Sequence, residues 1–215
     1  MNASMASTAP GKAARWLGHP GLWFALALIL GGGLFLRALL TPPRAALPTI
    51  YSVDPFQLTD EQGRSFSSEA LRGKVWVANF IFTRCPTICP VLTGRMGQVQ
   101  RRTAGLGNAI HLVSFTVDPE HDTPKVLSRY AEKNGASPRA WSFLTGDREA
   151  LKKVLVEGLR VQMTRDGPAD DLMSIGHAGH FVLVDQRMQV RGYYDLQEAQ
   201  AIDRLVADAG LLANP

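Results

Sequence analysis

The chain has 215 residues, of which 46% are hydrophobic and 20% are charged, and its formal net charge is +4. This length fits one folded domain with an appendage. Positions 1–44 carry four of the 23 Lys and Arg and no acidic residue, so 19 basic residues balance 19 acidic ones in the remainder. The domain is therefore about neutral, and the composition gives no support for nucleic-acid binding, which needs a basic face.

An apolar run at residues 21–40 contains a single charge, Arg37, near its end. Such a run is long enough to cross a bilayer as a helix. The basic residues before it favour a cytoplasmic N-terminus. A cleaved signal peptide is the alternative, although its apolar region is usually shorter and no clear small-residue cleavage site follows. Either way, the folded domain is expected on the periplasmic, extracytoplasmic side, where disulfides persist. We predict three segments before that domain: a cytoplasmic tail at 1–20, a single-pass anchor in the inner membrane at 21–40, and a proline-containing linker at 41–49.

The folded domain is predicted at residues 50–212, with strands that alternate with helices. In chain order, the expected elements are a hairpin at 56–66, a helical turn at 68–71, a strand at 74–82 followed by a helix to about 102, a strand at 110–117 followed by a helix at 124–134, a short strand at 141–144, a helix after Asp147 to about 158, a loop at 164–175, a hairpin at 180–194 and a helix at 196–209. This order predicts an α/β fold with a mixed central sheet flanked by helices.

The chain has two cysteines, Cys85 and Cys89, which follow directly on the apolar strand predicted at 74–82. A cysteine pair at the junction of a strand and a helix is typical of a thioredoxin-like domain. Unpaired N–H groups at the start of the helix should lower the pKa of the Cys85 thiol. The spacing also allows a disulfide, so the pair is either a redox pair or two ligands of a soft metal. An inert disulfide is the third interpretation, but closing so short a loop would add little stability.

A third candidate ligand is His177, which stands far downstream between Gly176 and Gly179. Glycines allow the close backbone approach that a folded-over loop needs. Two thiolates and one imidazole suit copper or zinc. His180 is a weaker candidate, because it alternates with apolar residues along a predicted strand and is equally explained as a structural histidine.

The segment from Asp118 to Pro124 contains two aspartates and two prolines between a predicted strand and a predicted helix. A turn followed by a helix cap explains these residue types. A docking role for a partner protein is the alternative.

Taken together, these features resemble the Sco/SenC family of membrane-anchored copper proteins, over roughly residues 54–209. The resemblance rests on three motifs: C-P-T-I-C-P at 85–90, V-D-P-E-H-D-T-P at 117–124, and His177 ahead of F-V-L-V-D at 181–185. It implies a thioredoxin-like fold and copper, as Cu(I) or Cu(II), bound by Cys85, Cys89 and His177. Gly176 stands where many members carry Asp.

The resemblance implies a metallochaperone that delivers copper to the dinuclear copper site of cytochrome c oxidase, with the copper-site subunit as its partner. Other copper carriers or thiol reductases are further candidate partners. The alternative is a thiol–disulfide oxidoreductase that reduces the cysteines of that site, with Cys85 and Cys89 as the catalytic redox pair. A peroxidase is disfavoured, because Phe82 and Pro86 stand where peroxiredoxins carry Thr, three residues before the reactive cysteine.

Overall fold

The computed structural model describes residues 20, 21, 23, 24, 27–29, 31, 32, 47–161 and 179–214. The chain divides into two compact units, Met1–Ala46 and Leu47–Pro215. In the first unit the described residues are helical, and they expose large apolar side chains: Trp23, Phe24, Leu28 and Ile29. No helix within the described stretches has both the length and the apolarity of a membrane span. The predicted tail, anchor and linker fall largely outside those stretches and stay predictions.

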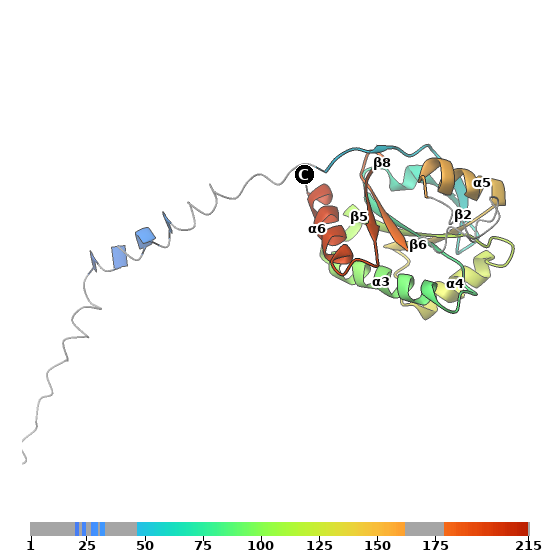
Figure 1. The fold of residues 1–215 in the computed structure, drawn as a ribbon, viewed down its shortest axis with the longest axis horizontal. Helices are drawn as coiled ribbons and strands as arrows, with labels where there is room; N and C mark the ends of the chain where they lie inside the picture. The colour runs from blue at the N-terminus through green and yellow to red at the C-terminus, as the bar shows by residue number, and fades with distance from the viewer. Residues whose placement is uncertain are drawn as a thin grey trace, which may run out of the picture. The chain divides into compact units, whose positions relative to one another are not determined.

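The described residues of the second unit form an eight-stranded mixed sheet in the order β1-β8-β7-β4-β5-β6-β2-β3 (Figure 1). The central β4, β5 and β6 are parallel to each other, and every other pairing is antiparallel. The strands are β1 (Tyr51–Ser52), β2 (Gln57–Asp60), β3 (Ser65–Ser67), β4 (Val75–Ile81), β5 (Ile110–Thr116), β6 (Trp141–Thr145), β7 (His180–Val184) and β8 (Gln189–Asp195).

Helices cover both faces of this sheet, as the alternation of elements predicted. The described α-helices of this unit are α3 (Ile88–Thr103), α4 (Pro124–Lys133), α5 (Arg148–Lys152) and α6 (Ala201–Ala213). A π-helical turn, Lys153–Gly158, continues α5, and two 3₁₀ helices lie at Ser68–Leu71 and Ala104–Ala109. Figure 1 shows α3 and α4 below the sheet and α5 above it.

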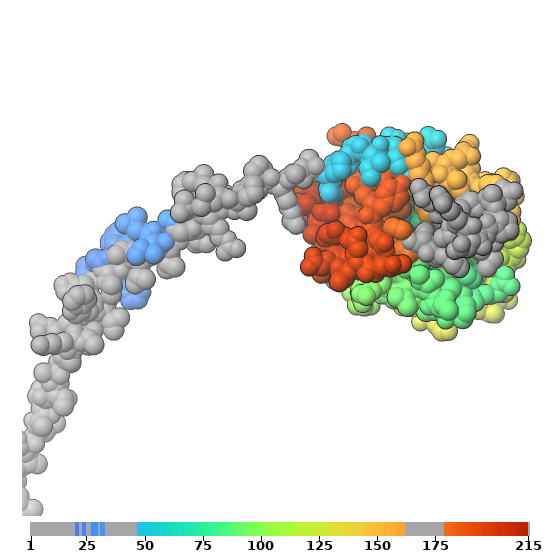
Figure 2. Space-filling model, in the orientation of Figure 1, coloured from blue at the N-terminus to red at the C-terminus, as the bar shows by residue number. Residues whose placement is uncertain are grey.

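Side-chain contacts tie α3 to its two neighbours on the same face. The hydroxyls of Thr93 on α3 and Tyr130 on α4 are 2.7 Å apart. Arg102 on α3 pairs with Asp203 on α6 at 2.6 Å, and Figure 2 shows these two helices side by side. The helix that follows the cysteines is therefore held from both sides.

The core is centred on β4 and β5, in which every residue is buried. This burial agrees with the continuous apolar runs, because a strand covered on both faces has no polar face. Some polar groups in and beside these strands pair with one another: Trp141 Nε1 of β6 donates to Ser114 Oγ at 2.8 Å, and Ser114 donates to Asn79 Oδ1 at 2.6 Å. Such pairing offsets the cost of burying a polar group. Among the described residues, the buried Asn79 Nδ2 and Trp76 Nε1 of β4 have no hydrogen-bond partner.

Two turn predictions are confirmed in detail. The hairpin of β2 and β3 closes through Gly63 with φ +77°, a conformation that favours glycine. Asp147 caps α5, because its carboxylate accepts from the N–H groups of Glu149 and Ala150.

The boundaries of two helices differ from the prediction. The helix that carries Cys89 begins at Ile88 instead of including Pro86 in its first turn. Cys85 precedes a proline, which disfavours helical geometry, and its N–H closes a turn onto the carbonyl of Phe82. The last helix begins at Ala201 rather than at residue 196, because Asp195 directs a turn in which its side chain accepts from the N–H of Gln197.

A short strand was also not predicted. β1 pairs with the edge of β8 through Tyr51 and Ser52. Two residues are too few to give a periodic signal in the sequence.

Candidate functional site

The candidate site lies where β4 ends and α3 begins, as the sequence predicted. Cys85 stands in the connecting turn, and Cys89 is the second residue of α3. Both are free thiols in the structure, and they are 7% and 1% exposed. Of the two thiols, only that of Cys85 is therefore slightly accessible to solvent.

The sulfur of Cys85 accepts a hydrogen bond from the start of α3 and lies beside the hydroxyl of Thr87. The N–H of Cys89 lies 3.4 Å from this Sγ, and the hydroxyl of Thr87 lies 3.7 Å from it. Burial opposes ionisation of the thiol, but these bonds and the N–H of Thr87 outweigh it and lower the pKa of Cys85 to about 7. This agrees with the expected effect of unpaired N–H groups at a helix start.

Cys89 has the opposite character. Burial is the main cause that raises the pKa of its thiol to about 12; the N–H of Phe82 lowers this pKa, and the neighbouring Cys85 and the charge of Asp122 raise it. The two cysteines are thus unequal: the Cys85 thiol ionises near neutral pH, whereas the more deeply buried Cys89 stays a thiol there. The sequence predicted the first property and gave no sign of the second, which depends on burial.

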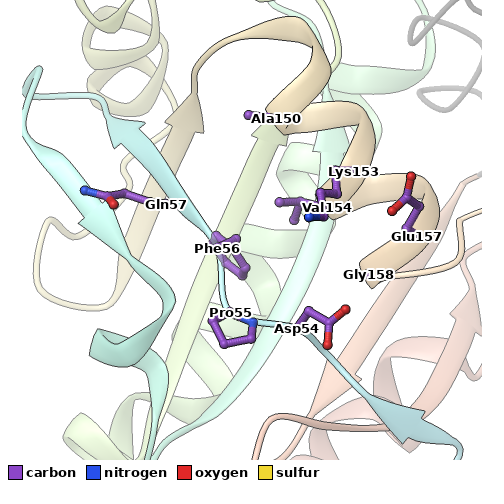
Figure 3. Close-up of a pocket in the computed structure, with 9 residues that line it drawn as sticks. All are labelled: Asp54, Pro55, Phe56, Gln57, Ala150, Lys153, Val154, Glu157 and Gly158. Carbon is purple, nitrogen blue, oxygen red and sulfur yellow. The ribbon is translucent and has the colours of Figure 1, made fainter.

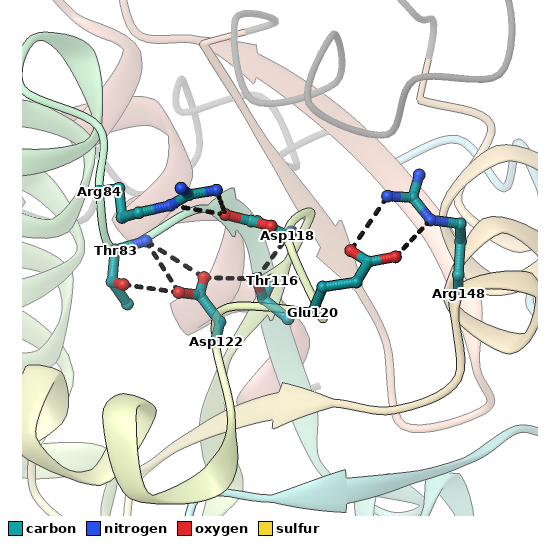
Figure 4. Close-up of polar contacts among 7 residues, drawn as sticks. All are labelled: Thr83, Arg84, Thr116, Asp118, Glu120, Asp122 and Arg148. Atoms are coloured by element: carbon teal, nitrogen blue, oxygen red, sulfur yellow. Dashed lines mark hydrogen bonds and ion pairs between the residues drawn. The ribbon is translucent and has the colours of Figure 1, made fainter.

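The turn that carries Cys85 is fixed by the segment between β5 and α4 (Figure 4). Asp122 is fully buried and accepts from the N–H and hydroxyl of Thr83 at 3.1 and 2.5 Å. Asp118 pairs with Arg84 at 2.6 Å. The segment does form the predicted turn before a helix, but Thr123 makes no side-chain cap to α4.

Three of the five histidines bear on the site or on the core. His177, the predicted third ligand, lies outside the described residues. His180 begins β7 with a side chain 40% exposed, and its Nε2 lies 3.8 Å from an Asp195 carboxylate oxygen. His111 is buried in β5 with its Nε2 3.0 Å from the hydroxyl of Ser142, and burial together with the charge of Lys74 lowers its pKa to about 4. Within the described part of the chain, no three His, Cys, Asp or Glu side chains gather as a metal site.

Gly179 shows where the chain arrives after His177. Its φ of +61° favours glycine, and its carbonyl accepts from the N–H of Leu196 at 3.0 Å. A Cβ on Gly179 would lie 4.0 Å from Cδ1 of Ile88, the first residue of α3. The chain therefore enters β7 beside the helix start that carries the thiols.

A cavity of about 180 Å³ lies elsewhere, between the segment 54–57 and α5 with its π-helical turn (Figure 3). None of its lining residues is a cysteine or a histidine. It is smaller than a typical ligand pocket and has no part in the thiol site.

The model of the SCO1/SenC family matches residues 45–209. The chain belongs to this family. Its domain has the mixed sheet and flanking helices of the thioredoxin-like Sco fold, as predicted.

Similar proteins agree with this assignment. The chain is 32% identical to the "SCO1 protein homolog" of Bacillus subtilis over 162 residues, which cover 75% of this chain and 82% of that protein. The structure of BsSco, described as "a member of the Sco family of cytochrome c oxidase assembly proteins", matches with a TM-score of 0.66 and 30% identity, over 78% of this chain and 96% of that one. ScoI of Bradyrhizobium japonicum "with copper bound" matches with a TM-score of 0.58 and 25% identity, over 75% and 99% of the two chains.

Proposed function

We propose that this protein binds copper through Cys85, Cys89 and His177 and delivers it to the copper-site subunit of cytochrome c oxidase. Soft thiolates suit Cu(I), and imidazole suits either oxidation state. Similar proteins are described as copper-bound and as oxidase assembly proteins. Copper is the cargo here, and the two free thiols at one helix start are the described part of its site.

The observation that carries the proposal is the position of Gly179 beside Ile88. His177 stands two positions before Gly179, and two extended residues span at most about 7 Å. A Cβ on Gly179 would contact Ile88, the residue next to Cys89, and this position supports His177 as the third ligand. His180, by contrast, pairs with Asp195 and belongs to β7, so we keep it outside the ligand set.

We also propose that residues 21–40 anchor the protein in the inner membrane with the domain on the periplasmic side. The described residues of this segment are helical, and Phe24, Leu28 and Ile29 are each at least 71% exposed. Exposed apolar side chains on a helix are stabilised by lipid. Fractionation of cells that express the full chain, followed by protease treatment of spheroplasts, tests both the anchor and the sidedness.

Copper titration of the full chain in detergent micelles tests the copper site. The reduced protein should bind about one Cu(I) per chain, as its single dithiol site suggests, and oxidation to the disulfide should abolish binding because the ligands must be thiolates. His177→Ala should lower the affinity, whereas His180→Ala should leave it unchanged. Wild-type affinity in the His177→Ala protein would remove this histidine from the site.

A second function is supported by the unequal thiols. Cys85, with its pKa near 7, can attack a partner disulfide as the thiolate and form a mixed disulfide. Cys89 then loses its proton, attacks the sulfur of Cys85 and releases the partner as a dithiol, while this chain becomes the disulfide. In this function the chain would reduce the cysteines of the oxidase copper site.

The two functions differ in their need for the imidazole. Thiol–disulfide exchange requires Cys85 and Cys89 but not His177. Full oxidase assembly in a strain that carries His177→Ala would therefore favour the reductase, and failed assembly with intact reductase activity would favour copper delivery.

A further inference from the structure

We propose that Asp122 is a positioning residue of the thiol site, which holds the turn of Cys85 in place from the segment between β5 and α4. Its carboxylate is fully buried, and its partners lie on two different segments. Thr83, two residues before Cys85, donates its hydroxyl to Oδ1 at 2.5 Å and its N–H to Oδ2 at 3.1 Å. Thr116, at the end of β5, donates its hydroxyl to Oδ2 at 2.6 Å. The carboxylate thus joins the end of β4 to the end of β5 (Figure 4).

The bonding pattern shows why a carboxylate stands here. Three donors converge on one buried side chain, and a carboxylate offers acceptors only, on both of its oxygens. Among the described residues, no Lys or Arg pairs with Asp122. Hydrogen bonds alone therefore compensate its burial, which fixes the positions of the groups that donate them.

The segment that carries Asp122 is itself held in place by hydrogen bonds within its own turn. The N–H of Asp122 donates to the carbonyl of Asp118 at 2.8 Å, and the N–H of Asp118 donates to Thr116 Oγ1 at 3.0 Å. Asp118 also holds Arg84, the residue between Thr83 and Cys85. Two consecutive residues before Cys85 are thus bound by one turn, and they place its sulfur at the N–H of Cys89.

This role differs from that of a helix cap or of a surface ion pair. The carboxylate oxygens of Asp122 accept from Thr83 and Thr116 at the ends of β4 and β5, and not from the N–H groups of α4. The nearby Glu120 pairs with Arg148 at 2.8 Å, but both side chains are exposed, at 60% and 41%. Glu120 therefore offers a matched control: a carboxylate in the same turn that does not touch the thiol loop.

The copper part of this inference rests on the proposed function, so the test uses two independent measurements on the reduced full chain in detergent micelles. The first is Cu(I) affinity, by competition with a chromophoric Cu(I) chelator. The second needs no metal: the ratio of the alkylation rates of Cys85 and Cys89 by iodoacetamide at fixed pH, followed by mass spectrometry. A wild-type chain that fails to bind Cu(I) would defeat the proposed function, while the alkylation ratio would still test Asp122.

Asp122→Ala should lower Cu(I) affinity by about 10- to 100-fold, the usual loss when a partner of a metal ligand is removed. It should also lower the Cys85 to Cys89 alkylation ratio several-fold, because the Cys85 sulfur leaves its place at the helix start. Asp122→Asn should stay within about threefold of wild type, since Oδ1 of the amide can accept from Thr83 and Thr116 while Nδ2 donates to Thr83 Oγ1. Glu120→Gln should match wild type in both measurements.

A second control separates positioning from loss of stability. Val190→Ala removes a buried side chain on β8 and should lower the thermal midpoint without changing either measurement. The inference is overturned if Asp122→Ala behaves as wild type, if Asp122→Asn is as impaired as Asp122→Ala, or if Val190→Ala reproduces the defect at a similar loss of stability. If Asp122→Ala does not fold, Thr83→Ala replaces it; a smaller shift in the same direction supports the inference, and no shift overturns it.

Discussion

Two turns each depend on a buried aspartate: the hairpin turn on Asp60, and the turn that carries Cys85 on Asp122. The two aspartates differ in where their hydrogen-bond donors lie in the sequence. Asp60 accepts from the N–H groups of Gln62 and Arg64, within four residues of itself. Asp122 accepts from Thr83, which is 39 positions away. The first turn is closed by its own sequence, whereas the second exists only because two segments of the chain meet. A turn that depends on a distant segment can couple a functional loop to the rest of the fold.

The largest expected effect is on stability, and it tests this contrast directly. Asp122→Ala leaves the Thr83 N–H and the Thr116 hydroxyl without their acceptor in a buried site, which should cost about 2–6 kcal/mol at 1–3 kcal/mol for each unsatisfied group. Asp60→Ala should cost only about 1 kcal/mol, because Gln62 and Arg64 are exposed and water can replace the carboxylate. Urea unfolding of both variants measures the difference. Equal losses would show that the two turns are held alike.

The next effect concerns the two thiols of the braced turn. Alkylation of Cys85 should rise with a midpoint near pH 7, because its thiolate forms there. Cys89 should react at least about a hundredfold more slowly at pH 7.5, since its pKa near 12 leaves almost no thiolate and its lower access slows it further. Rates measured on Cys85→Ser and Cys89→Ser proteins from pH 5 to 9 check this order. Similar profiles for the two single-cysteine proteins would contradict the asymmetry.

A smaller effect is expected from His111. Its imidazole is buried in the sheet, where it is paired across strands with a neutral group and not with a charged side chain. Its folded pKa, about 4, lies below the unfolded value of 6.5, so between these values the unfolded chain binds a proton that the folded chain does not. Stability should therefore fall as the pH falls from 6.5 to 4, by about 2–3 kcal/mol from this residue. Thermal unfolding of the His111→Gln protein across this pH range should show a loss of stability that is smaller by this amount. An unchanged pH slope in the variant would exclude His111 as its source.

The smallest expected effect comes from Glu120, which lies in the same turn as Asp122 but faces solvent. Its hydrogen bonds with Arg148 lower the pKa of its carboxyl, yet both side chains are exposed. Exposed ion pairs contribute little, so Glu120→Gln should change the free energy of unfolding by less than about 0.5 kcal/mol. A loss as large as that of Asp122→Ala would mean that the whole turn acts as one unit.

Much of the fold followed from the sequence because its signals are local. The continuous apolar runs of β4 and β5, the Gly63 hairpin and the Asp147 cap each depend on neighbouring residues, and each was confirmed. Two helix starts, those of α3 and α6, were less well predicted, because a proline after Cys85 and a side-chain turn at Asp195 compete with helix formation over a few residues.

The site was predicted in its chemistry but only partly in its arrangement. The spacing of Cys85 and Cys89 and their place after a buried strand indicated a nucleophilic thiol at a helix start. The segment of Asp118 and Asp122 was interpreted as a turn with a cap or as a docking site, and its bonds to Thr83 and Arg84 were not foreseen. A pattern of short polar residues marks a turn, but it does not say which distant donors the turn will meet.

The sequence by itself determined the order of strands and helices, the family and the thiol pair, because apolar periodicity, turn residues and motif spacing act over short stretches of chain. Only the tertiary structure decided that Cys89 is buried behind Cys85, that Asp122 reaches the turn of the thiols, and that Gly179 enters β7 beside Ile88. These properties arise from burial and from contacts between residues far apart in the chain. Both depend on how the segments pack, and packing is a property of the whole fold.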